Sequence, residues 1–63
     1  LPDELVGALD NDLELAEAFA NLTPGRQKSY VINLNGAKAS TTRSARIEKF
    51  RDKILAGKGA NEY

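Results

Sequence analysis

The chain has 63 residues, nine acidic and nine basic side chains, and neither cysteine nor histidine. This composition excludes disulfides and the catalytic arrangements built on histidine or cysteine, and it removes the commonest zinc ligands. A chain of this length forms a single domain, whose core supplies only about 3–5 kcal/mol of stability. We therefore expect no enzymatic activity in the chain itself, no cofactor and no metal site.

Two short helices are predicted in the first third of the chain. The first covers about residues 2–10, where Pro2 suits the first helical turn because its missing N–H would be unpaired there. The second covers about residues 12–21, with Asn11 or Asp12 as its N-cap. Apolar side chains recur at helical spacing, which predicts one inward face on each helix. The inward residues are Leu5, Leu9, Leu15, Phe19 and Leu22.

Two longer helices are predicted in the rest of the chain. The third covers about residues 24–37, with Thr23 as its N-cap and a proline at its first position. The fourth begins with Ser40 or Thr41 as its N-cap and stops before Gly57, a residue typical of helix C-termini. The inward residues of these helices are Tyr30, Leu34, Ile47, Phe50 and Ile54.

Together these elements predict an all-α fold, a small bundle of about four helices with one core. We expect the helical domain to span residues 1–57 and residues 58–63 to form a frayed C-terminal tail. The chain lacks the ~20 consecutive apolar residues of a membrane span. Its acidic start lacks the basic and apolar stretches of a signal peptide, so a cytoplasmic location is expected. The start without methionine suggests that this is the C-terminal module of a longer protein.

Charge is divided unequally along the chain. Residues 1–25 carry six acidic and no basic side chains, whereas residues 26–58 carry nine basic and two acidic ones. A basic surface could bind nucleic acid or acidic lipid. Alternatively, the two parts neutralise each other within the fold. We favour the second interpretation, because no basic run interleaved with aromatic residues is present.

Four residues near the start of the fourth helix are candidates for binding an anion or a partner: Lys38, Thr42, Arg43 and Arg46. A helix N-terminus attracts anions, and three of these side chains are cationic. The alternative is structural. The two arginine stems would cover the core while their heads pair with acids of the first two helices.

Other polar residues are interpreted as structural. Tyr30 is expected at the core edge, with its hydroxyl reaching water or a backbone group. The acid pairs in the first third are expected to be solvated rather than to perform acid–base chemistry. These pairs are Asp10/Asp12 and Glu14/Glu17.

A longer pattern joins several of these residues. It runs Ala-Lys, three residues, Thr-Arg, two residues, Arg-Ile, and occupies residues 37–47. Upstream of it lie Leu5, Ala8, Leu9, Phe19, Thr23, Pro24 and Tyr30 at matching spacings. The pattern resembles the C-terminal domain of the YdeI/OmpD-associated, or bacteriocin-protection, family over about residues 1–57. The resemblance implies a helical domain, often behind another small domain, linked to bacterial resistance to bacteriocins. It implies no catalytic residues.

Three functions are consistent with these features. The first is a non-catalytic binding or accessory module of a bacteriocin-protection or stress-resistance protein, whose partner is a protein or a neighbouring domain of the same chain. The alternative is a helical domain that binds nucleic acid through the basic second half. The third is an appendage of an enzyme whose chemistry lies in another domain. We favour the first, and we do not expect nucleic acid as the partner.

Overall fold

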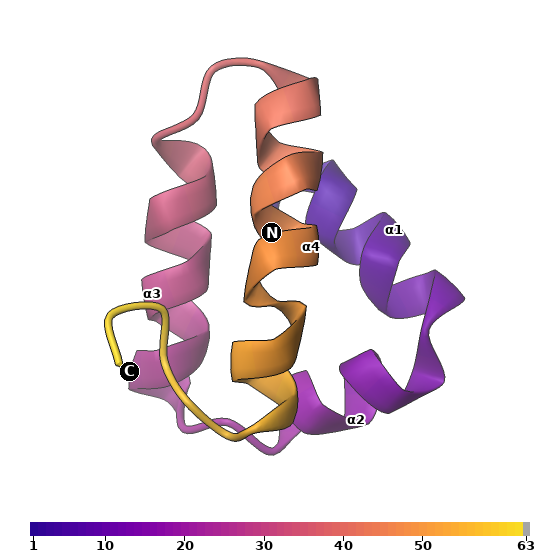
Figure 1. The fold of residues 1–63 in the computed structure, drawn as a ribbon, viewed down its shortest axis with the longest axis vertical. Coiled ribbons are helices and arrows are strands. Elements are labelled where there is room, and N and C mark those ends of the chain that lie inside the picture. Colours follow the sequence, from indigo (N-terminus) through magenta and orange to yellow (C-terminus); the bar gives the residue numbers. More distant parts are fainter. Residues whose placement is uncertain (63) are drawn as a thin grey trace.

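A computed structural model describes residues 1–62, which form four helices joined by short connections (Figure 1). The described part of the chain contains no strand, so the all-α prediction is confirmed. The helices are α1 (Asp3–Asn11), α2 (Leu13–Ala20), α3 (Pro24–Asn35) and α4 (Ser40–Leu55).

The beginnings of α2 and α3 follow the predicted capping residues. The Asp12 carboxylate accepts a hydrogen bond from the Leu15 backbone N–H at 3.2 Å. The Thr23 hydroxyl accepts one from the Arg26 N–H at 3.3 Å. Each bond satisfies one of the backbone donors that a helix N-terminus leaves unpaired. Asp12, rather than Asn11, is therefore the cap of α2.

The predicted capping of α4 by Ser40 or Thr41 is wrong. The N-cap is Ala39, and no side chain caps this helix. Ser40 is the first helical residue, and its hydroxyl instead donates to Glu4 Oε2 of α1 at 2.6 Å. A hydrogen bond donated to an ionised carboxylate is stronger than one to a neutral oxygen. This contact ties the start of α4 to the first turn of α1.

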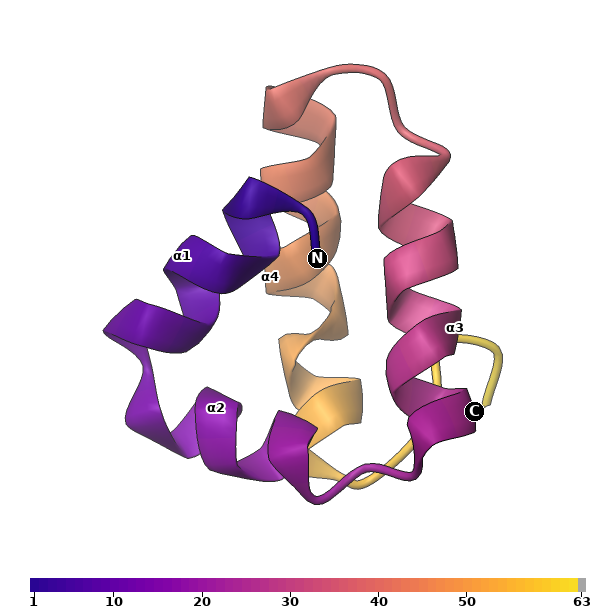
Figure 2. The same ribbon diagram turned by 180° about the vertical axis from the view of Figure 1, so that it is seen from behind.

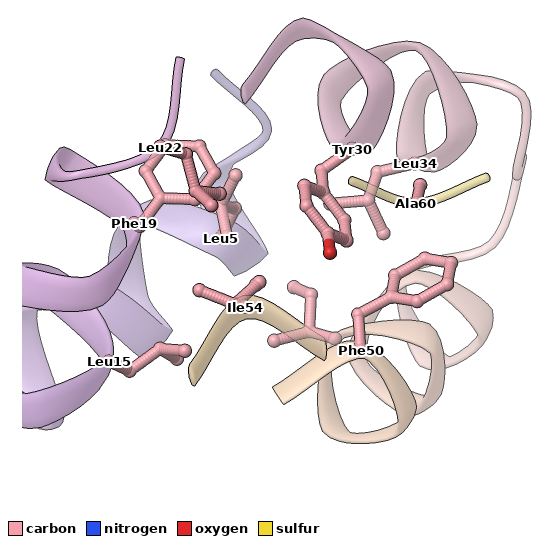
Figure 3. Packing of buried hydrophobic residues seen from close by; sticks show 10 residues of the cluster. Leu5, Leu15, Phe19, Leu22, Tyr30, Leu34, Phe50, Ile54 and Ala60 are labelled. Carbon is pink, nitrogen blue, oxygen red and sulfur yellow. The ribbon is translucent and has the colours of Figure 1, made fainter. Parts of the chain in front are cut away.

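Helix α4 is the central element of the fold. It contacts α1, α2 and α3. Figures 1 and 2 show α1 and α2 on one side of α4 and α3 running alongside it on the other. Because α4 must bury side chains towards three neighbours, its inward residues supply the middle of the core (Figure 3).

The core closely follows the predicted helical faces. Of the predicted residues, only Leu9 is half-buried rather than buried, and it still packs against the core cluster. The rings of Tyr30 and Phe50 meet edge to face with their centroids 5.2 Å apart, a favoured aromatic geometry. Among the described residues, Ala37, Gly59 and Ala60 are buried as well.

The C-terminal end of α4 is closed by a left-handed glycine. Gly57 has φ = +78°, the only positive φ in the described chain. Its N–H donates to the Ile54 carbonyl, and the Lys58 N–H donates to the Lys53 carbonyl, both at 3.0 Å. These two bonds are those of a Schellman motif, which reverses the chain after a helix.

Replacing Gly57 by alanine is expected to lower the free energy of unfolding by about 1–2 kcal/mol, because a Cβ disfavours the left-handed conformation. The measurement is urea unfolding followed by circular dichroism. The matched control is Gly25→Ala in α3, where an added Cβ meets no atom within 4 Å. The control is expected to be neutral or stabilising. Equal destabilisation by the two substitutions would contradict the assigned role of Gly57.

Residues 58–62 differ from the expected frayed tail. After the reversal at Gly57, this segment lies along α3 (Figures 1 and 2). Ala60 is only 8% exposed and joins the core cluster. The Tyr30 hydroxyl donates to the Lys58 carbonyl at 2.5 Å, which confirms the expected backbone partner for that hydroxyl. Residue 63, the last of the predicted tail, lies outside the described residues.

Candidate functional site

The four candidate residues lie in the connection after α3 and in the first two turns of α4. Lys38 and Thr42 are exposed, whereas Arg43 and Arg46 are half-buried. The structure gives no side-chain hydrogen bond to Lys38 or Thr42 within residues 1–62, and it directs the two arginine heads to different helices. The four side chains therefore do not converge on one point.

Arg43 joins the start of α1 to the connection between α3 and α4. Its Nε donates to Glu4 Oε1 at 2.8 Å and its Nη2 to Glu4 Oε2 at 3.1 Å, a bidentate pair. Its Nη1 donates to the Ala37 carbonyl at 2.8 Å and to the Lys38 carbonyl at 3.3 Å. Bidentate arginine–carboxylate pairs are the stronger and more directional ion pairs.

Glu4 places a carboxylate where the sequence predicts an external anion. The hydrogen bonds from Arg43 and then from Ser40 lower the pKa of Glu4 from 4.5 to about 2. Only 15% of its side chain is exposed, against 24% for Arg43. The N-terminal end of α4 thus has an internal carboxylate beside it, which also suits the positive end of the helix dipole.

Arg46 has a partner other than the expected one. We expected its head to pair with an acid of α1 or α2, as that of Arg43 does. Instead its Nη1 donates to the Asn33 carbonyl at 2.8 Å and to the Asn33 side-chain oxygen at 3.2 Å. Because α3 runs alongside α4, Arg46 faces the C-terminal turn of α3, where a cation is favoured by the helix dipole.

Two further ion pairs connect distant parts of the chain, and the sequence interpretation did not identify them. Arg51 Nε of α4 lies 3.0 Å from Asp12 Oδ2, next to the start of α2. Arg26 Nε of α3 lies 2.5 Å from Glu62 Oε1 in the C-terminal segment. The capping pattern did identify Asp12 as a candidate N-cap of the second helix. No local pattern could join these partners, because each pair is 36 or 39 residues apart.

The pKa values of both carboxylates reflect these contacts. The Leu15 backbone N–H and then Arg51 lower the pKa of Asp12. Arg26 and then the Gly59 backbone N–H lower the pKa of Glu62 to about 2. A carboxylate that receives such hydrogen bonds stays ionised and acts as an anchor rather than as a proton donor near neutral pH.

The other acids of the first third face solvent. Asp10, Glu14 and Glu17 are exposed, whereas Asp12 is half-buried by its cap and its ion pair. The interpretation of solvated acid pairs therefore fails for Asp12. Within residues 1–62, no three acidic side chains lie close enough together to hold a metal ion. None of the described helices combines the length and apolar character needed to cross a membrane.

Comparison with known proteins identifies a family that matches most of this chain. The matching family is described as "Bacteriocin-protection, YdeI or OmpD-Associated", and the match covers residues 1–57. The chain is also 45% identical over 62 residues to "Uncharacterized protein YdeI" of Bacillus subtilis (strain 168). That alignment covers 98% of this chain and 32% of the relative, so the chain spans about a third of the relative's length. No solved structure matches the chain. The match over residues 1–57 shows that the chain belongs to the bacteriocin-protection, YdeI or OmpD-associated family.

Proposed function

We propose that this chain is a non-catalytic binding module of a bacteriocin-protection or stress-resistance protein, and that it binds a protein or a neighbouring domain of the same chain. The observation that carries the proposal is the use of the charged side chains within the fold. Three arginines of α4 bind groups on the other helices or their connections, namely Glu4, Asn33 and Asp12. Side chains held in this way anchor helices and are not placed to act on a substrate.

Two large apolar side chains support a protein partner. Leu13 at the start of α2 is 74% exposed, and Ile32 of α3 is 62% exposed. They lie on helices on opposite sides of α4 (Figures 1 and 2). Protein interfaces bury such side chains at their centres and surround them with polar ones. Each side of the domain therefore offers an exposed apolar side chain, and Val6 of α1 is a further one on the side of α2.

The outward face of α4 favours a protein partner over nucleic acid. Nucleic-acid binding requires a continuous basic surface that neutralises several phosphates. The exposed charged residues of this helix are Glu48, Lys49 and Asp52, two acids around one lysine. Its arginines point towards the other helices or their connections instead. The basic second half of the sequence therefore does not become a basic stripe on α4.

The comparison with the relative supports a neighbouring domain as the partner. The matched segment makes up 32% of the Bacillus subtilis protein. The test is to titrate the isotope-labelled chain with the remainder of that protein and to record amide chemical shifts. We expect saturable shifts around Leu13 or Ile32, abolished by Leu13→Asp or Ile32→Asp. The matched control is Thr41→Asp, an exposed site on α4. Unchanged shifts in the presence of a folded remainder would contradict the proposed partner.

A further inference from the structure

The outward faces of α1 and α2 expose apolar side chains that the fold leaves uncovered. Leu13 is 74% exposed, the largest value among the large apolar side chains of the described residues, and Val6 is 40% exposed. Both helices lie on the same side of α4 (Figures 1 and 2). Exposed apolar side chains surrounded by polar ones are typical of protein interaction sites. The charges around these two residues indicate the chemistry of the partner.

The exposed charged side chains of these two helices are all acidic. On α1, Asp3 and Asp10 lie three and four residues from Val6, so the three share one face of the helix. On α2, Glu17 lies one turn after Leu13 and is exposed on the same face. Residues 1–25 contain no lysine or arginine. The exposed acids of the two helices are Asp3, Asp10, Glu14 and Glu17.

The arginines of α4 do not neutralise this face. Arg43 and Arg51 are bound to the carboxylates of other residues. Two of the exposed acids lie within electrostatic reach of these arginines without forming an ion pair. Asp10 and Glu17 have no ion-pair partner within residues 1–62. Their charges are therefore available to a partner.

Asp10 and Glu17 also lie where the fold itself disfavours an acid. Asp10 is in the last turn of α1, and Glu17 is in the last turn of α2. The C-terminal end of a helix is the negative end of its dipole, so it favours a basic side chain and repels a carboxylate. Neither of these turns contains a basic residue. Residues that oppose the local preferences of a fold are expected at functional sites.

We propose that the outward faces of α1 and α2 dock a partner protein through a basic segment that carries an apolar side chain. The apolar side chain covers Leu13, and lysines or arginines beside it pair with Asp10 and Glu17. Such charge complementarity selects the partner and fixes its orientation. Nucleic acid and anionic lipid have the opposite preference, because this face repels phosphates. The inference specifies the chemistry of the partner in the proposed function and rests on that function.

A second copy of this chain fits the face less well. On α3, the exposed Lys28 lies one turn before the exposed Ile32, so this side also combines an apolar and a basic side chain. A single lysine offers one charge to two unpaired acids, however. The occupant that matches the face is therefore a different basic segment.

The probe that tests the inference is a synthetic Lys-Leu-Lys-Lys-Leu-Lys peptide with blocked ends, titrated into the isotope-labelled chain. We expect saturable amide shifts at Asp10, Leu13 and Glu17. A Lys-Ser-Lys-Lys-Ser-Lys peptide of the same charge should bind at least about tenfold more weakly, because it has no apolar side chain to cover Leu13. Equal affinities of the two peptides, or the absence of saturable binding, would overturn the inference.

A pair of charge reversals separates this face from the rest of the surface. Asp10→Lys combined with Glu17→Lys should weaken binding of the leucine peptide at least about tenfold. The matched control is Glu48→Lys combined with Asp52→Lys, the same change of charge at two exposed acids of α4. The control should bind the peptide as the unaltered chain does. Equal losses in the two chains would show attraction by net charge alone and would contradict the inference.

Stability provides a second readout of the same variant. Because each lysine replaces an acid at the negative end of a helix, the Asp10→Lys and Glu17→Lys chain should unfold at no lower urea concentration than the unaltered chain. A lower urea midpoint would show that these acids serve the fold and would contradict their role in binding.

Two further outcomes identify a different occupant. Sedimentation velocity of the chain alone should show a monomer; concentration-dependent association that Lys28→Glu abolishes would make a second copy the occupant and overturn the inference. The peptide titrations do not use the neighbouring domain. Peptide binding without binding of that domain would contradict only the proposed partner, whereas binding of that domain to a chain carrying both lysine substitutions would overturn only this inference.

Discussion

Replacing Ile54 by alanine is expected to unfold the chain at 25 °C. Ile54 is 1% exposed, lies on the central helix α4 and belongs to the core cluster. Truncating such a side chain costs about 2–5 kcal/mol through lost burial and the cavity left behind. A single domain of this length has a total stability of about 3–5 kcal/mol. Far-UV circular dichroism and urea unfolding of the variant test this expectation.

The matched control is the same substitution at an exposed isoleucine. Ile32 of α3 is 62% exposed, so Ile32→Ala should change the free energy of unfolding by no more than about 0.5 kcal/mol. A cooperative transition in the Ile54→Ala chain at the urea concentration of the unaltered chain would contradict the core described above.

Acidification is expected to destabilise the chain between about pH 4.5 and pH 2. The pKa values of Glu4 and Glu62 fall from 4.5 to about 2 in the folded chain. A carboxylate whose pKa is lowered by folding makes its full contribution to the free energy of unfolding when the pH is above the pKa that it has in the unfolded chain. That contribution disappears as the pH falls through the folded value, because protonation then removes the charge opposite the arginine. The measurement is the urea midpoint as a function of pH.

The Glu4→Gln variant isolates one of these contributions. It should be less stable than the unaltered chain near neutral pH and should lose less stability on acidification. Glu17→Gln, at an exposed acid without an ion pair in the described residues, is the matched control and should follow the unaltered chain. Parallel pH profiles for the Glu4→Gln and unaltered chains would show that the pair with Arg43 does not stabilise the fold.

The helices and their inward faces could be predicted because both depend on local spacing. Leu15 and Phe19 lie one turn apart, and Phe50 and Ile54 repeat that spacing, so the period of 3.6 residues identifies the buried side. Ala60 could not be found in this way. It lies outside any helix, in a turn closed by a hydrogen bond from the Glu62 N–H to the Gly59 carbonyl, where apolar spacing gives no periodic signal.

For the charged residues, the sequence could predict the sign of the partner's charge but not which residue the partner is. The unequal distribution of charge indicated that basic residues would meet the acids of α1 and α2, and the pair between Arg43 and Glu4 is of that kind. The position of Arg46 against Asn33 depends on how α3 runs alongside α4, which no local pattern specifies. The pair between Arg26 and Glu62 requires the chain reversal at Gly57.

The arginines at the start of α4 are interpreted as anchors of the fold rather than as an anion site, and fluorescence anisotropy tests this most directly. Labelled duplex and single-stranded oligonucleotides are titrated with the chain at low salt. We predict no binding above a weak background, together with reduced stability of the Arg43→Ala variant. Binding through about six phosphate contacts should have micromolar affinity and should weaken roughly a thousandfold between about 50 and 200 mM salt. Such binding would contradict the interpretation if the Arg43→Ala and Arg46→Ala substitutions abolished it while the chain remained folded.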